Sequence, residues 1–192
     1  MPPPRLPPLP LDPLPPACGA WLDALPRNAL VGRLAPVNVL GTLLYAPTVL
    51  PDFLRYWSAA KTQLTLSFRE QELVILRLAV LHRCDYIWRH HVPVAAEYGV
   101  TAVERAALRA GPAPGDFPPR ETALLALTTV FQRAGAVEDA GWARAAADLT
   151  AADIVGLIHL VAQYQVFALV NNVLRVPLEP ALRPLEGLDA AA

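Results

Sequence analysis

Residues 67–99 constrain the fold most, because they carry the signals of two consecutive helices joined by a cluster of reactive side chains. Ser67 precedes Glu70 by three residues, which is the spacing of a capping box, and apolar residues then recur at helical spacing. These signals predict one helix that begins directly after Ser67 and a second that ends near residue 99, with Asp85 as its cap. The joint between the two helices is expected at Cys84.

Similar signals along the rest of the sequence predict an all-α chain. No stretch alternates with strand-forming residues at a period of two, so no strand is expected. In the helix predicted for residues 49–64, Lys61 is expected to face water. The expected cap of the helix 49–64 is Thr48. The other expected helical segments are 21–34, as one or two short helices, 36–45, 102–110, 118–134, 141–148 and 154–174. Thr101 and Glu104 are expected to open 102–110, Asp116 to cap 118–134 and Gly135 to end it, and Thr150 and Asp153 to open 154–174.

The start of the chain is unusually rich in proline, with nine prolines in the first sixteen residues. Such a segment is expected to be an extended polyproline II arm. We expect residues 1–20 to form this arm and residues 21–192 to form a single domain. The arm should pack on its own domain or on a neighbouring subunit, and display of a PxxP motif to a partner is the alternative.

The charges and cysteines exclude several classes of function. The chain has 16 basic and 17 acidic residues and a net charge of −1, so a nucleic-acid partner is not expected. Two distant cysteines, Cys18 and Cys84, make neither a disulfide framework nor a zinc site, and a reducing cytoplasm is the expected location. The apolar fraction of 54% favours a homo-oligomer.

The segment 154–174 is uncharged and long enough to span a bilayer. Its polar side chains, among them His159, Gln163 and Asn171, would be costly against lipid. We therefore expect this helix in the centre of the domain or at a subunit interface, without a role in a membrane.

The cluster around Cys84 follows the spacing of a known active site. Glu72 is followed after eleven residues by Cys84, after two more by Ile87 and after three more by His91. This pattern resembles the Glu-x11-Cys-x2-Cys-x3-His motif of the peroxidase branch of the carboxymuconolactone decarboxylase and alkylhydroperoxidase D superfamily. The sequence Tyr-Ile-Trp-Arg-His-His-Val-Pro is closer to a second branch, which has Tyr-Glu-Trp-x-x-His-Val-Pro. The resemblance also covers residues 68–76 and, more loosely, 47–53 and 172–177.

This resemblance implies an alkylhydroperoxidase D-like bundle of helical hairpins that associates as dimers, trimers or hexamers. It also implies a cofactor-independent enzyme that acts on a small organic acid or lactone, with His91 as the residue that transfers the proton. Glu72 and Cys84 are the other candidate catalytic residues. The candidate substrate-binding residues are Tyr86 and Trp88, which could line a pocket, Arg83 and Arg89, which could hold a carboxylate, and His90.

Ile87 departs from both branches and leaves two alternatives open. Isoleucine cannot exchange a disulfide with Cys84, so peroxide reduction would rest on Cys84 alone or with the distant Cys18, with Glu72 and His91 in the proton relay. A thiol at the start of a helix can be reactive, but a free cysteine can equally be an inert buried residue. The second alternative is a non-catalytic ligand-binding or scaffold protein.

The charged and metal-ligating side chains of this region have simpler interpretations as well. Glu72 could serve a structural role by pairing with Arg69, Arg77 or Arg83. The histidines and the cysteine of the cluster do not have the spacing of a standard metal site, so neither a metal nor a cofactor is expected.

Overall fold

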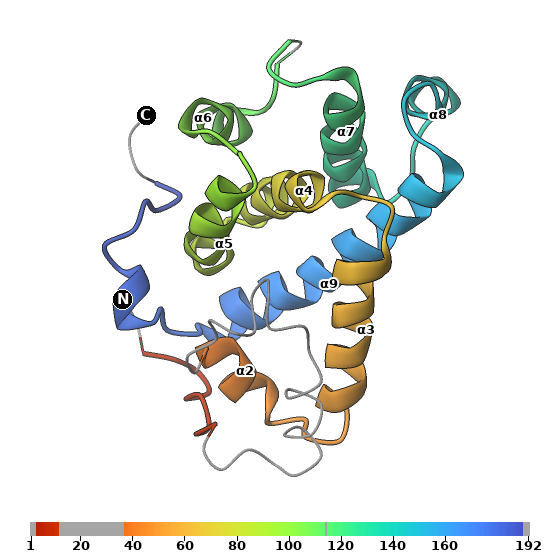
Figure 1. Cartoon of the computed structure of the whole chain (residues 1–192). Helices are drawn as coiled ribbons and strands as arrows, with labels where there is room; N and C mark the ends of the chain where they lie inside the picture. The colour runs from red at the N-terminus through yellow and green to blue at the C-terminus, as the bar shows by residue number, and fades with distance from the viewer. Residues whose placement is uncertain (1–2, 12–36, 114, 190–192) are drawn as a thin grey trace.

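The computed structural model describes residues 3–11, 37–113 and 115–189, and within these ranges the chain is built of helices without a β-strand (Figure 1). The prediction of an all-α fold is confirmed. The helices are α2 (Asn38–Leu43), α3 (Leu50–Gln63), α4 (Phe68–Leu81), α5 (Asp85–Glu97), α6 (Ala102–Ala110), α7 (Pro119–Ala134), α8 (Asp139–Ala146), α9 (Ala151–Leu174) and the short 3-10 helix η2 (Pro180–Leu182).

The central helix of this bundle is α4. It packs against α5, α6, α7 and α9, which surround it in Figure 1. All ten residues from 70 to 79 are buried, including Glu72 and Arg77. A charged side chain in such a position is stable only if other groups of the protein bond to it. The polar partners of α4 are therefore as important to the fold as its apolar contacts.

Three capping boxes begin helices at the positions expected from the sequence. The N-cap hydroxyl accepts from the backbone N–H three residues on, and the acidic residue at that position accepts from the N-cap N–H. These local signals need no tertiary contact, which is why they could be read correctly. The pairs are Ser67 with Glu70, Thr101 with Glu104, and Thr150 with Asp153.

Three other caps predicted from the sequence were wrong. The N-cap of α3 is Val49 rather than Thr48, and no side chain caps that helix. The N-cap of α7 is Pro118, while the carboxylate of Asp116 accepts from the backbone N–H of Ala113 within the preceding loop. Asp85 is the first residue of α5, and its carboxylate accepts from outside the first turn of the helix. In each case, another hydrogen bond or a proline start replaces the expected cap.

The described part of the proline-rich arm lies on the domain itself. The backbone N–H of Arg5 donates to the carbonyl of Leu174 at 2.9 Å, and that of Leu9 donates to the carbonyl of Gly41 at 3.1 Å. A Cβ atom at Gly41 would lie 2.5 Å from the carbonyl oxygen of Leu9, so the arm can approach α2 this closely only because residue 41 is glycine. The helices expected in 21–34 lie outside the described residues.

α9 has one buried side and one exposed side. Its buried side packs against α2, α3, α4, α5 and α7. By length and composition it is the one described helix that could cross a membrane, yet 56% of its most apolar window is buried in the protein, as in the core helix of a bundle. An exposed apolar stripe runs along its other side and consists of Val155, Ile158, Val166, Leu169 and Val173.

Candidate functional site

A tight turn between α4 and α5 creates the candidate site. Arg83 has a positive φ of 51°, and the backbone N–H of Cys84 donates to the carbonyl of Ala79 at 2.8 Å. This turn reverses the chain direction, so α5 packs back against α4. Residues that are far apart in the sequence on either side of the turn, such as Glu72 and His91, can therefore meet.

Glu72 and His91 are in direct contact inside the bundle. Nδ1 of His91 lies 2.6 Å from Oε2 of Glu72. Both residues are buried, with 1% of Glu72 and 5% of His91 exposed. Two of the three predicted catalytic residues are therefore brought together by the α4–α5 hairpin.

The second oxygen of Glu72 is bound by a residue that sequence reasoning placed on the surface. Nζ of Lys61, in α3, donates to Oε1 of Glu72 at 2.9 Å, and Lys61 is only 8% exposed. The predictions that Lys61 faces water and that an arginine pairs with Glu72 were both wrong. Arg69 instead binds Glu104 and Glu121. Packing of α3 near α4 and α9 turns the ammonium group inward, where the buried carboxylate compensates its charge.

Tyr164 of α9 completes the group and was missed by the sequence analysis. Its hydroxyl lies 3.3 Å from Nε2 of His91, and the two rings meet edge to face at 5.3 Å. Lys61 Nζ lies 6.0 Å from the centre of the Tyr164 ring. Lys61, Glu72, His91 and Tyr164 thus form a continuous chain of polar contacts that joins α3, α4, α5 and α9.

The protonation states follow from the charges. Burial by itself raises the pKa of Glu72, but Lys61 and His91 outweigh it and lower that pKa to about 2. Burial lowers the pKa of His91 below its usual value of 6.5, although Glu72 partly opposes this. Burial also raises the pKa of Tyr164 well above 10. At neutral pH the group therefore contains a carboxylate, a neutral imidazole and a neutral phenol.

These states fix the direction of the hydrogen bonds. The ionised carboxylate of Glu72 can only accept, so Nδ1 of His91 carries the ring proton and donates it. Nε2 then has a free lone pair, and the hydroxyl of Tyr164 donates to it. The arrangement presents His91 Nε2 as a base whose protonated form would be stabilised by Glu72.

Cys84 lies in a different environment. It is completely buried, and burial raises the pKa of its thiol to about 11. The backbone N–H groups of Tyr86 and Ile87 lower this pKa without offsetting burial. At neutral pH the thiol is therefore protonated, which is the form that does not act as a nucleophile. Within the described residues, no hydrogen bond joins Cys84 to Glu72 or His91.

The polar residues predicted to bind substrate on α5 hold the C-terminal segment. The hydroxyl of Tyr86 donates to Oε1 of Glu179 at 2.7 Å, and Nε2 of His90 lies 2.9 Å from Oε2 of the same carboxylate. Arg89 binds Asp85 and the carbonyl oxygen of Arg183. The polar atoms of these three residues are thus engaged within the chain. Their role in substrate binding stays a prediction.

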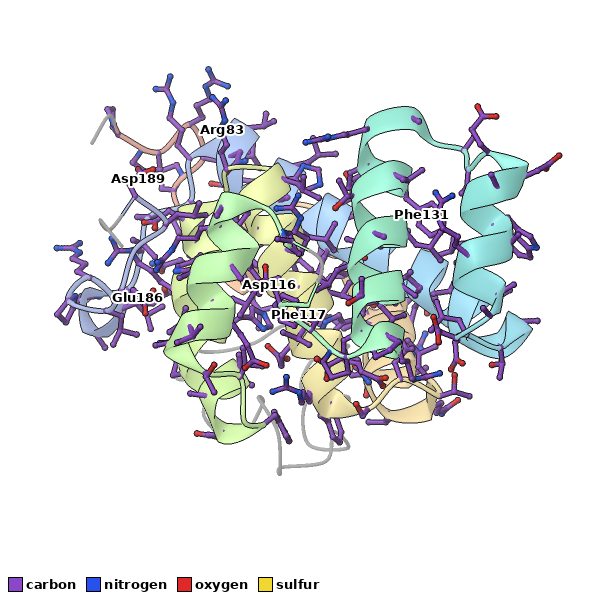
Figure 2. All side chains as sticks on the ribbon, turned by 90° about the horizontal axis from the view of Figure 1, so that it is seen from above. Arg83, Asp116, Phe117, Phe131, Glu186 and Asp189 are labelled. Carbon is purple, nitrogen blue, oxygen red and sulfur yellow. The ribbon has the colours of Figure 1, made fainter. Side chains whose placement is uncertain are left out.

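The two remaining predicted substrate-binding residues lie at opposite extremes of exposure. Trp88 is fully buried, and the guanidinium of Arg109 lies 4.7 Å from the centre of its ring. Arg83 is exposed at the edge of the helical body, whereas Glu186 and Asp189 mark the C-terminal segment on its flank (Figure 2).

In the described part of the chain, no group of three histidine, cysteine or acidic residues could hold a metal ion.

One feature of the sequence could have identified Lys61. It is the single lysine among the 16 basic residues of the chain, all the others being arginine. Lysine carries its charge on one compact group, which suits a single carboxylate oxygen in a narrow buried space. Tyr164 offers no such signal, because an aromatic residue in an apolar helix is most often a packing residue.

Residues 47–130 match the carboxymuconolactone decarboxylase family. No curated protein sequence matches the chain.

Several solved structures share the fold. An uncharacterized peroxidase-related protein from Ralstonia eutropha JMP134, with an alkylhydroperoxidase AhpD core, is similar with a TM-score of 0.78 at 19% identity, over 95% of each chain. One from Silicibacter sp. TM1040 has a TM-score of 0.75 at 17% identity, over 96% of this chain and 98% of that one. The debrominase Bmp8, as a cysteine-to-alanine variant in complex with 2,3,4-tribromopyrrole, has a TM-score of 0.75 at 15% identity, over 92% of each chain. At these identities the likeness shows the alkylhydroperoxidase D-like helical fold.

The buried pair of Lys61 and Glu72 predicts a large loss of stability in Lys61→Met. The substitution leaves a buried carboxylate with one partner fewer, so the free energy of unfolding should fall by about 3 kcal/mol in urea titrations. Arg55→Met, on the same helix, removes an exposed pair with Asp52 and should cost less than about 1 kcal/mol. Equal losses in the two variants would contradict the assigned importance of the buried pair.

The lowered pKa of His91 predicts a loss of stability in acid. As the pH falls below 6.5, the unfolded chain takes up a proton that the folded chain resists, so the free energy of unfolding decreases by up to about 1.4 kcal/mol per pH unit until the folded-state pKa is passed. Urea midpoints between pH 8 and pH 5 should show this decrease. His91→Gln should show a smaller decrease, whereas His159→Gln, at an exposed histidine, should retain it in full.

Proposed function

We propose that this chain is a member of the carboxymuconolactone decarboxylase and alkylhydroperoxidase D-like superfamily. We propose further that it is a cofactor-independent enzyme that transfers a proton through His91 on a small organic acid or lactone. The observation that carries the proposal is the hydrogen-bonded series Glu72–His91–Tyr164, with Lys61 on the other carboxylate oxygen. A carboxylate, an imidazole and a hydroxyl in this order suit acid–base catalysis.

The proposed step uses the neutral form of His91. Tyr164 passes its hydroxyl proton to Nε2 while its oxygen receives a proton from the substrate, so the imidazole becomes cationic and the phenol is restored. Glu72 stabilises the imidazolium through Nδ1. Reversal of the transfer delivers a proton to another atom of the substrate. If a carboxylate is lost as CO2, the carbon that carried it takes this proton, and one solvent proton is consumed.

Peroxide reduction at Cys84 is the less favoured alternative. Its support is the position of Cys84 at the start of α5, where backbone N–H groups lower the pKa of the thiol. Burial nevertheless raises that pKa to about 11, and Ile87 occupies the position at which the peroxidase branch has a second cysteine. The imidazole is therefore the better supported reactive group. A non-catalytic ligand-binding or scaffold role is favoured by Ile87, which departs from both branches, and by the deep burial of His91.

Two substitutions separate the imidazole from the thiol. His91→Gln should lower the rate of lactone consumption, followed by ultraviolet absorbance, by about 100-fold or more, because the proton-accepting nitrogen is removed. Cys84→Ser should remain within about twofold of the unmodified protein, since the thiol takes no part in the proposed step.

Each alternative has a distinct signature in the same experiment. Peroxide turnover that disappears in Cys84→Ser and persists in His91→Gln would replace the proposal with the thiol route. Consumption of neither lactone nor peroxide, together with a ligand that raises the melting temperature, would replace it with the binding role.

We also propose that the protein is a homo-oligomer that associates through the exposed apolar stripe of α9. The stripe carries no charged side chain, so it is complementary to a second copy of itself. Leu169 is 54% exposed within it, and Val103 on α6 is 79% exposed outside it.

Sedimentation velocity tests this association. Leu169→Glu places a charge on the stripe and should shift the protein toward the monomer, because burying an unpaired carboxylate is unfavourable. Val103→Glu should sediment like the unmodified protein. An unchanged sedimentation coefficient in Leu169→Glu, with helical content retained, would exclude this stripe as the interface.

A further inference from the structure

Arg77 carries a buried positive charge that no carboxylate of the described chain balances. The residue lies on α4 and is only 6% exposed. Lys61 is buried to a similar degree, but its charge is balanced by Glu72. A buried charge without a counter-charge is costly. Within the described residues, the arginines that form ion pairs are Arg55, Arg69, Arg89, Arg105, Arg109 and Arg120.

The hydrogen bonds of Arg77 hold its guanidinium in place without neutralising it. Nη1 donates to the carbonyl oxygen of Leu108, near the end of α6, at 2.9 Å. Nε donates to the hydroxyl oxygen of Thr129, on α7, at 3.2 Å. Both acceptors are uncharged, and the C-terminal end of a helix supplies only about half a negative charge. A substantial part of the positive charge therefore stays unbalanced.

The free end of Arg77 is in contact with solvent. Its third nitrogen, Nη2, makes no hydrogen bond within the described residues. In the same part of the chain, the residues with side-chain atoms that are both enclosed and without a partner are Trp57, Gln71, His82, Trp88, Arg109, Gln163 and Asn171. Arg77 is not one of them, so the small exposed part of this residue includes Nη2. A small ligand can therefore reach the two N–H groups of this nitrogen.

A second guanidinium lies beside the first. Arg133 follows Thr129 by four residues on α7, so both side chains lie on the same face of that helix. Burial lowers the pKa of Arg77, and the nearby charge of Arg133 lowers it further. Arg133 is exposed, and it forms no ion pair with a carboxylate in the described part of the chain. An anion between the two like charges would relieve their repulsion.

We infer that Arg77 and Arg133 bind a small divalent oxyanion of the phosphate class where the last turns of α6 and α7 pack on α4. The planar fork of N–H groups on a guanidinium matches two oxygens of a phosphate group. Two positive charges without a counter-charge favour a dianion over a monoanion. Arg77 follows Glu72 by five residues and so lies about 140° around α4 from it. The site is therefore separate from His91 and does not depend on the proposed reaction.

Calorimetric titration of the full chain at pH 8 and low ionic strength tests this inference with sodium phosphate, acetate and chloride. Phosphate is mainly a dianion at this pH and should bind to one site per chain with a Kd of about 1 mM or below. Acetate has the same oxygen geometry with a single charge and should bind at least about fivefold more weakly. Chloride offers no pair of oxygens to the fork and should bind more weakly still.

Glycerol phosphate distinguishes the two sources of such an anion. Binding at least as tight as that of inorganic phosphate would identify the ligand as the phosphate group of an organic ester. Weaker binding would identify it as the free anion. Both results support a phosphate site at the two arginines.

Substitutions of Arg133 locate the site and leave the buried bonds of Arg77 in place. Arg133→Gln should weaken phosphate binding about fivefold or more, because one of the two charges is lost. Arg133→Glu should abolish the binding, since it places a carboxylate beside Arg77. Arg183→Gln removes the same charge from an exposed arginine of the C-terminal segment and should bind phosphate normally. Absence of phosphate binding, acetate binding as tight as phosphate, equal losses in Arg133→Gln and Arg183→Gln, or undiminished binding in Arg133→Glu would each overturn the inference.

Discussion

The carboxylate of Glu72 is the group on which the interior of this bundle depends. It lies buried in α4, the helix on which α5, α6, α7 and α9 pack, where an unpaired negative charge would be strongly destabilising. Lys61 and His91 each bind one of its oxygens. Their bonds tie α3 and α5 to α4, so the packing of three helices and the ionisation of one side chain depend on each other. The same contacts orient the imidazole of His91.

This arrangement explains why the imidazole, rather than the thiol, is the better candidate for chemistry. Both groups are buried and both lose their charged forms for that reason. For His91 the neutral form is the useful one, because it has a free lone pair at Nε2 and an anion behind it. For Cys84 the neutral form is the unreactive one. The same physical effect therefore supports one candidate and weakens the other.

The C-terminal segment gives α5 a second, structural function. Glu179 accepts from Tyr86 and from the backbone N–H of Asn38 at 2.6 Å, and it also binds His90. Burial raises the pKa of Glu179, but these donors outweigh it and lower the pKa, which keeps the carboxylate ionised. Residues that resemble a substrate-binding motif in the sequence thus anchor the chain's own carboxylate. One face of α5 therefore carries His91 of the proton-transfer group, and the other face binds the C-terminal segment.

The sequence by itself determined the local features of this protein. The helical class, the three capping boxes, the α4–α5 joint and the candidacy of Glu72 and His91 could be predicted, because each depends on neighbouring residues or on a motif of fixed spacing. Only the tertiary structure decided which side chains complete the site. Lys61 and Tyr164 lie 11 and 73 positions from their partners. Their orientation follows from how α3 and α9 pack on α4, and helical periodicity within a single segment contains no information about that packing.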